Sequence, residues 1–276
     1  MTVRPGLART ESPIGFLEIA TKLRSLAVAT LAGVLSGTVA LGVGCRLAMR
    51  IVAMLASDAD QGSLTDAAAV VGDVSIGGTM FLALLGGAVG TIGGQLYLAV
   101  HRRLVWAGRW RGVAYGALLL AIFGSVLIQS DNPDFERFGI PIVNVVLFAA
   151  LFVAFGILLA PVYDNLQRVV STPSRTITGY ALFAAQAAGT LLSLFPILFV
   201  VAFMVDTLGD TGFVALGLLA LFCYMLVALP AVSVLRALRP RLPSTGAPRA
   251  IAAILPLAPP VAFGLALDVH ELLAIF

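Results

Sequence analysis

Charged side chains are scarce in this sequence. Asp, Glu, Lys and Arg together make up 11% of its 276 residues, whereas apolar side chains make up 60%. Soluble domains carry roughly 25% charged residues, and a soluble fold of this length has no core large enough to bury so much apolar surface. The composition therefore excludes an ordinary soluble protein and favours a chain that is surrounded by lipid.

Residues that carry catalysis or hold cofactors are also few. Cys45 and Cys223 fall inside apolar runs, where unpaired thiols behave as small apolar side chains. His101 and His270 stand near opposite ends of different runs, and the single lysine, Lys22, precedes all of them. A bis-histidine haem and a lysine-linked retinal are therefore excluded, and no H-E-x-x-H, G-x-S-x-G or nucleotide-binding glycine motif occurs. We expect no cofactor, no metal and no enzymatic activity.

Long apolar runs fill most of the chain. A helical crossing of the bilayer needs about 20 apolar residues, and lipid forces each crossing to satisfy its own backbone groups. We predict an all-α polytopic membrane bundle of about seven transmembrane helices, folded as one domain over 25–276. The spans are expected at residues 25–55, 79–100, 112–129, 141–163, 179–205, 213–235 and 250–276. A tail over 1–24 precedes them, with a short interfacial helix over 13–24.

The last predicted span contains Pro256, Pro259 and Pro260. A proline inside a helix removes one backbone hydrogen bond and clashes with the preceding turn. We therefore expect this span to be broken near 256–260 and to continue as a straight helix only afterwards.

The distribution of charge predicts the orientation. All Lys and Arg residues except Arg46, Arg50 and Arg137 lie in the N-terminal tail or in the second, fourth and sixth loops. All acids except Glu11, Glu18 and Asp164 lie on the opposite side. Cytoplasmic loops carry the excess of bases, so we expect a cytoplasmic N-terminus and an outside C-terminus. One lysine beside sixteen arginines favours a bacterial source, and hence the plasma (inner) membrane. Scattered bases without a stripe or motif exclude nucleic acid.

Glycines recur at helical intervals in the first two spans. Gly86, Gly90 and Gly94 are four residues apart in the second span, as are Gly33 and Gly37 in the first. Small residues at this spacing let membrane helices approach closely. We expect these two spans to pack tightly. The same glycines could instead hold a membrane-protein partner or a second copy of the chain, and membrane lipids are the remaining expected partners.

Arg46 and Arg50 are the leading candidates for a ligand site. They lie four residues apart near the end of the first span, so they project from one helix face. A guanidinium binds phosphate and carboxylate with two parallel hydrogen bonds. If they face the bundle interior, they would bind an anion. If they lie at the outer interface, they would pair with carboxylates or lipid phosphates, and the sequence leaves both interpretations open.

Asp73, Asp268 and Glu271 are the candidate ion-pair or relay partners of those arginines. Asp268 and Glu271 are three residues apart near the end of the last span, with His270 between them. Metal sites usually take three or four converging protein ligands, and only the two acids share a helix face. We therefore expect no metal here.

Two functions fit these patterns. The first is an integral membrane protein that binds or transports an anionic or amphipathic small molecule. The alternative is a non-catalytic membrane scaffold, or an accessory subunit that uses its glycine faces and basic loops to hold a partner.

Overall fold

The computed structural model describes residues 14–55, 75–128, 140–171, 176–192 and 257–275. These residues form helices and no strand, which confirms the all-α class. Four helical stretches are long and apolar enough to cross a membrane, as expected of a multi-pass membrane protein: Ile19–Leu55, Ile76–Val100, Pro141–Val169 and Ala258–Ile275. The count of seven spans and the sidedness of the termini stay predictions.

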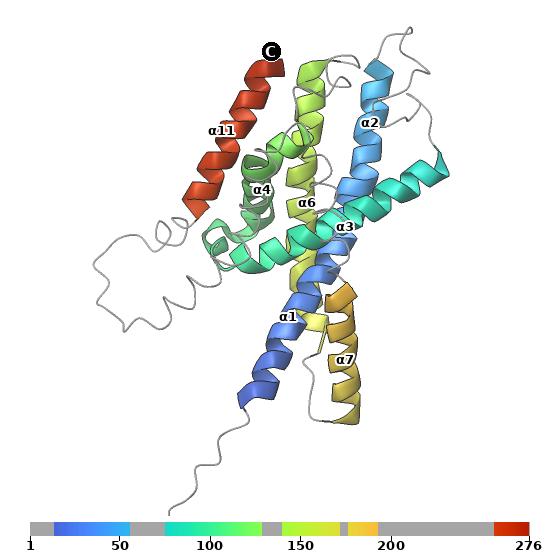
Figure 1. The fold of residues 1–276 in the computed structure, drawn as a ribbon, viewed down its shortest axis with the longest axis vertical. Coiled ribbons are helices and arrows are strands. Elements are labelled where there is room, and N and C mark those ends of the chain that lie inside the picture. Colours follow the sequence, from blue (N-terminus) through green and yellow to red (C-terminus); the bar gives the residue numbers. More distant parts are fainter. Residues whose placement is uncertain (1–13, 56–74, 129–139, 172–175, 193–256, 276) are drawn as a thin grey trace, which may run out of the picture.

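The first span is one continuous helix. It comprises α1 (Ile14–Gly37), a π-helical segment η1 (Thr38–Val43) and α2 (Gly44–Leu55) (Figure 1). No proline interrupts it, and the segment expected as a separate interfacial helix over 13–24 instead forms the first turns of α1. The helix is much longer than the about 20 residues that one crossing needs, so it tilts or projects beyond the bilayer.

Helix α3 (Ile76–Val100) crosses the first span obliquely (Figure 1). Ser75 caps its N-terminus, because the Ser75 hydroxyl accepts a hydrogen bond from the Gly78 N–H at 3.1 Å. After α3, the short 3-10 helix η2 (Val105–Trp110) leads into α4 (Arg111–Leu127). The second and third predicted spans therefore agree with α3 and α4 to within a few residues.

Glycines bring the backbones of α1 and α3 together. A Cβ built on Gly94 would lie 2.9 Å from the Cα of Gly33, and one built on Gly90 would lie 2.6 Å from the Cα of Gly37. The expected tight packing of the first two spans is confirmed. This face of α3 is filled within the chain, so a partner or second copy could use it only by displacing α1.

The remaining described helices are α6 (Pro141–Val169), α7 (Ile177–Leu192) and α11 (Ala258–Ile275). Helix α6 packs against α4, α7 packs against α1, and α11 packs against α4. Pro259 and Pro260 lie in the first turn of α11, where the missing N–H groups cost little. Several predicted positions lie outside the described residues: the whole span 213–235, residue 129 of the third span, residues 193–205 of the fifth, residues 250–256 and 276 of the last, and Asp73.

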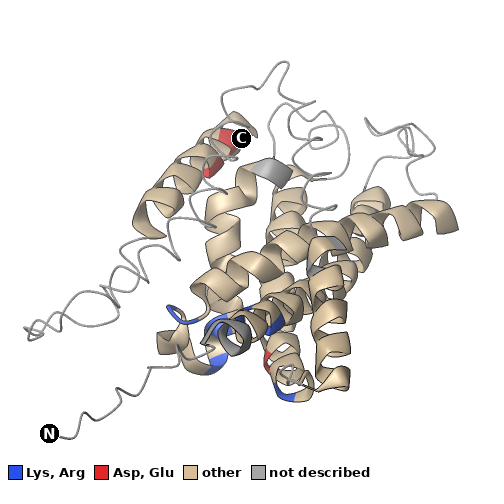
Figure 2. Cartoon of the chain, turned by 60° about the horizontal axis from the view of Figure 1, so that its bottom comes forward, with Lys and Arg blue, Asp and Glu red and all other residues tan. Residues whose placement is uncertain are grey.

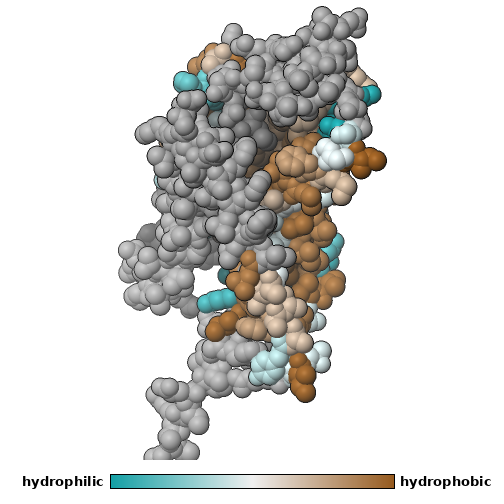
Figure 3. All heavy atoms as spheres, turned by 45° about the vertical axis from the view of Figure 1, so that its right-hand side comes forward, coloured by the Kyte–Doolittle hydropathy of each residue, from teal (hydrophilic) through white to brown (hydrophobic). Residues whose placement is uncertain are grey.

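Charge divides the bundle into two ends. Apart from Arg46 and Arg50 on α2, the described Lys and Arg residues gather where α3 and α6 end and α4 begins, together with the early part of α1 (Figure 2). We call this region the basic end; it holds Lys22, Arg24, Arg102, Arg103, Arg109, Arg111 and Arg168. The described acids Asp268 and Glu271 lie in the later part of α11, whereas Asp164 lies at the basic end beside Arg111 (Figure 2). Large apolar side chains are exposed over much of the described part of the face in Figure 3, as lipid contact requires.

Candidate functional site

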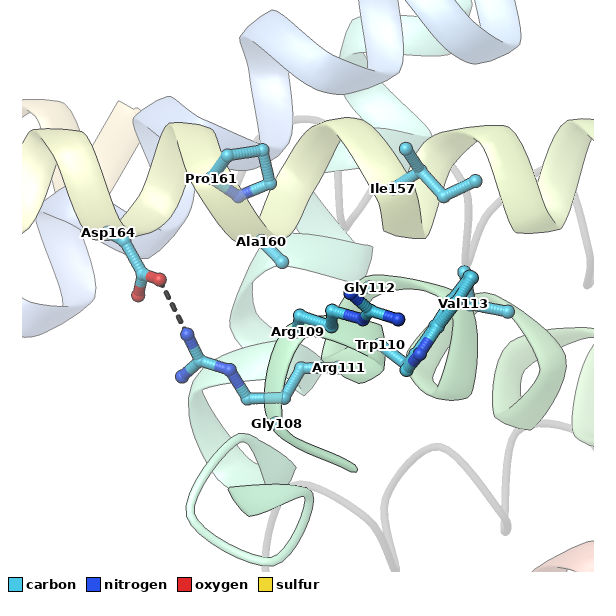
Figure 4. Close-up of a pocket in the computed structure, with 10 residues that line it drawn as sticks. All are labelled: Gly108, Arg109, Trp110, Arg111, Gly112, Val113, Ile157, Ala160, Pro161 and Asp164. Carbon is cyan, nitrogen blue, oxygen red and sulfur yellow. Dashed lines mark hydrogen bonds and ion pairs between the residues drawn. The ribbon is translucent and has the colours of Figure 1, made fainter. Parts of the chain in front are cut away.

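A groove of about 360 Å³ opens at the basic end (Figure 4). One wall is the turn from η2 into α4, residues 108–113, and the other is formed by Ile157, Ala160, Pro161 and Asp164 of α6. Its volume lies at the lower end of the range of small-molecule pockets, about 300–1,000 Å³. We call it the basic groove.

Gly108 shapes the first wall of the basic groove. Its backbone has φ +52°, a left-handed conformation that glycine adopts at little cost. The turn is closed by the Arg111 N–H, which donates a hydrogen bond to the Gly108 carbonyl. Among the described residues, no atom beyond the chain neighbours of Gly108 lies within 4 Å of a Cβ built on it, so the backbone conformation, and not lack of space, favours glycine. The turn places Arg109 and Trp110 beside the groove (Figure 4).

An ion pair joins the two walls. Nη2 of Arg111, the first residue of α4, lies 2.6 Å from Oδ2 of Asp164 on α6 (Figure 4). Their side chains are 30% and 34% exposed, and pairs this open to solvent contribute little stability. Its main effect is therefore positional, because it holds the Arg111 guanidinium against α6.

Arg109 is the second cation of the basic groove. Its guanidinium carbon lies 5.3 Å from the centroid of the Trp110 ring, in a cation–π contact. Arg109 pairs with no carboxylate in the part of the chain that the structure describes. Trp110 is 59% exposed and Trp106 is 58% exposed. Exposed tryptophans are typical of the membrane–water interface.

Three tyrosines pack behind the groove. The Tyr97 ring meets those of Tyr115 and Tyr163 edge-on, with centroid distances of 4.9 Å and 5.3 Å. The Tyr115 hydroxyl donates to the Gly93 carbonyl, and the Tyr163 hydroxyl accepts a hydrogen bond from Gln167. The Tyr97 hydroxyl is buried and has no hydrogen-bond partner among the described residues. Such an atom costs free energy unless something else satisfies it.

His101 follows α3 at the edge of this cluster. Burial lowers its pKa, and the charges of Arg102 and Arg111 lower the pKa further, against the raising effect of a hydrogen bond to Leu98. The ring is therefore neutral near pH 7. Its Nδ1 lies 2.8 Å from the Leu98 carbonyl, which can only accept, so Nδ1 carries the proton and donates.

Arg24 fixes the early part of α1 to the end of α6. Its Nε donates to the Val170 carbonyl at 2.6 Å, and its Nη1 donates to Oε1 of Gln167 at 2.9 Å. A further bond joins Nη2 to the Gln167 carbonyl. A cation at the C-terminal end of a helix satisfies its free carbonyls and opposes its negative dipole end. The basic end is thus held together by side chains from α1, α3, α4 and α6.

The arginines singled out from the sequence lie elsewhere. Arg46 is half-buried on α2. Its guanidinium lies near the first turn of α3: a Cβ built on Gly78 would be 3.8 Å from Nη2 of Arg46. Arg50 is exposed one turn later. Whether they contact a ligand stays a prediction.

The candidate acids that the structure describes lie on α11. Oδ1 of Asp268 accepts a hydrogen bond from the backbone N–H of Ser125 on α4 at 2.6 Å. Oε1 of Glu271 lies 3.8 Å from Nδ1 of His270. Helix α11 packs against α4, whereas the arginine-bearing α2 packs against α6 and α3. The two candidate sets therefore belong to different helix pairs.

The sequence-based search missed the basic groove. Residues 164–178 contain one acid, Asp164, and two bases, Arg168 and Arg175. A single acid among bases indicates an ion pair, and this was the available sequence signal. Both tryptophans of the chain, Trp106 and Trp110, fall in the other basic loop. Comparison with protein-family models, with curated proteins and with solved structures finds no match. The chemistry of the groove is therefore the basis for assigning a function.

Proposed function

We propose that this chain is an integral membrane protein that binds an anionic amphipathic small molecule in the basic groove. The observation that carries the proposal is Arg109, a cation without a carboxylate partner among the described residues, beside a groove whose other walls are largely apolar. A guanidinium recognises phosphate and carboxylate through paired hydrogen bonds. The apolar side chains of Val113, Ile157 and Pro161 can take the tail of the same molecule.

Helix α4 adds to the attraction for anions. The groove includes Gly112 and Val113 from its first turn. The Arg111 N–H is taken by the Gly108 carbonyl, but the helix dipole still places positive potential at this end of α4. This potential favours a negatively charged group next to Arg109.

The arginines around the basic groove also predict which face of the membrane the groove lies at. Loops rich in arginine remain in the cytoplasm, so we place the basic groove at the cytoplasmic face of a bacterial plasma membrane. Arg46 and Arg50 would then lie toward the outer face, as a second anion contact. Transport, unlike binding alone, requires contacts on both sides of the bilayer.

The first test is native mass spectrometry of the detergent-purified chain. We expect a bound anionic mass in the wild type that is lost in Arg109→Gln. Arg168→Gln is the matched control, because Arg168 is an exposed arginine on the last turn of α6, outside the groove. Loss in Arg46→Gln/Arg50→Gln but retention in Arg109→Gln would move the site to α2. A stoichiometric protein subunit in place of a small ligand would favour the scaffold function.

A further inference from the structure

We infer that the ligand of the basic groove is a membrane phospholipid with a singly charged phosphodiester and a hydroxyl-bearing headgroup. This inference rests on the proposed function and names its ligand class. The groove contains the guanidinium groups of Arg109 and Arg111 and the carboxylate of Asp164. Its formal charge is therefore +1, which matches a phosphodiester. A phosphomonoester carries about −1.5 to −2 near pH 7 and would remain partly uncompensated.

The two arginines have different tasks in this site. Arg111 is already held by Asp164 at 2.6 Å, so its charge is largely compensated. Arg109 makes only the contact with the Trp110 ring among the described residues, and its donors are available for a phosphate. We assign the phosphate to Arg109 and to the positive end of the α4 dipole, where Gly112 and Val113 line the groove beyond the Arg111 N–H that closes the turn.

Asp164 provides a hydroxyl acceptor. Arg111 takes one carboxylate oxygen, Oδ2. The other oxygen, Oδ1, makes no hydrogen bond with a described residue. A carboxylate can only accept hydrogen bonds when ionised, so the group that completes it is a donor. A hydroxyl on the second or third carbon of the headgroup is an uncharged donor that can reach Oδ1 while the phosphate contacts Arg109.

The shape of the groove indicates that the ligand comes from the bilayer. Ile157 is 47% exposed and Trp110 is 59% exposed, so the walls are open to the surroundings of the bundle. Tryptophans at this level lie among lipid headgroups. A headgroup in the groove leaves its acyl chains free to run along the apolar faces of α4 and α6. A water-soluble anion would gain nothing from these walls.

The tryptophans make the test direct, because both of them lie in or next to the groove. The full chain with Trp106→Phe, in nanodiscs of phosphatidylcholine, reports through Trp110 alone. Brominated phosphatidylglycerol is then added, since bromine quenches indole emission on contact. We expect quenching that saturates as the brominated lipid is added. The lipid fraction at half-maximal quenching should be about tenfold higher in Arg109→Gln, because this variant loses one charge-assisted contact. Arg168→Gln should leave the curve unchanged.

Other lipids define the headgroup. Brominated phosphatidylethanolamine and phosphatidic acid should quench less at equal mole fraction. Asp164→Asn raises the formal charge of the groove to +2, so it should shift the preference from phosphatidylglycerol toward phosphatidic acid. This second variant keeps the test valid if Arg109→Gln does not fold.

The outcomes separate the two proposals. Equal or stronger, Arg109-dependent quenching by a brominated fatty acid or by phosphatidic acid would overturn the phosphodiester assignment and leave the proposed function standing. Full protection from quenching by glycerol phosphate or inorganic phosphate alone would identify a soluble anion and overturn the lipid assignment. Quenching that rises linearly with every brominated lipid and ignores Arg109 would overturn both.

Discussion

Gly37 of α1 and Gly90 of α3 bring two membrane helices into backbone contact. A Cβ built on Gly90 would lie 2.6 Å from the Cα of Gly37, closer than real Cβ contacts allow. Membrane helices gain little from the hydrophobic effect and rely on such close packing. The crossing of α1 and α3 therefore depends on the absence of side chains at these positions.

Gly90→Ala should destabilise the bundle, because the added methyl has backbone and not a flexible side chain in its way. We expect a loss of about 2 kcal/mol or more, the cost of overpacking. Gly77→Ala is the control on the same helix, since no described residue apart from its neighbours along the helix comes within 4 Å of its built Cβ. Thermal unfolding in detergent measures both; equal midpoints for Gly90→Ala and wild type would show that the helices do not meet here.

Tyr97 and Tyr115 provide a matched pair for the cost of a buried hydroxyl. Tyr115→Phe removes the hydrogen bond to the Gly93 carbonyl and should cost about 1 kcal/mol. Tyr97→Phe removes a hydroxyl with no partner among the described residues, so it should leave stability unchanged or raise it. Chemical denaturation in mixed micelles gives both values. A loss for Tyr97→Phe as large as for Tyr115→Phe would mean that the Tyr97 hydroxyl is satisfied.

His101 should make stability depend on pH. Its pKa in the folded protein is lowered below the ordinary 6.5, chiefly by burial. The unfolded chain therefore binds a proton at a pH where the folded chain does not, and stability falls as the pH drops from about 6.5 through the lowered pKa. Above that window the full stability is present. Unfolding midpoints of wild type and His101→Gln, measured from pH 8 to pH 5, should diverge at the acid end; parallel curves would contradict this.

Arg24→Gln should loosen the end of α6. The substitution removes the bonds to the Gln167 and Val170 carbonyls and the positive charge at the helix C-terminus. We expect a loss of about 1–2 kcal/mol and faster hydrogen exchange near the end of α6. Arg168 is an exposed arginine on the last turn of α6, the turn that Arg24 contacts. Arg168→Gln therefore controls for the loss of one positive charge at this helix end. Unaltered exchange in Arg24→Gln would show that α1 does not hold this helix end.

Local patterns in the sequence predict the helices and one helix contact. The apolar runs mark α3, α4 and the core of α6, because a bilayer requires continuous apolar length. The spacing of Gly86, Gly90 and Gly94 predicts the contact with α1, because small residues at that interval have one strong physical use.

The basic groove could not be predicted in the same way. Its ion pair joins Arg111 of α4 and Asp164 of α6. No local sequence pattern in either segment predicts that these two residues are in contact. Arg46 and Arg50 stand out in the sequence because they are charges inside an apolar run. Arg109 is one arginine among several in a basic loop, so the sequence does not distinguish it from its neighbours.

The π-helical segment Thr38–Val43 has a consequence for α2. Gly33, Gly37 and Gly42 all lie against α3, although their spacings are four and then five residues. The wider turn accommodates the additional residue, and one residue corresponds to about 100° of rotation about a helix axis. Gain or loss of one residue within this turn would re-aim Arg46 and Arg50, while the contacts of Gly33 and Gly37 with α3 would remain in place. The two halves of this span can therefore change direction independently during evolution.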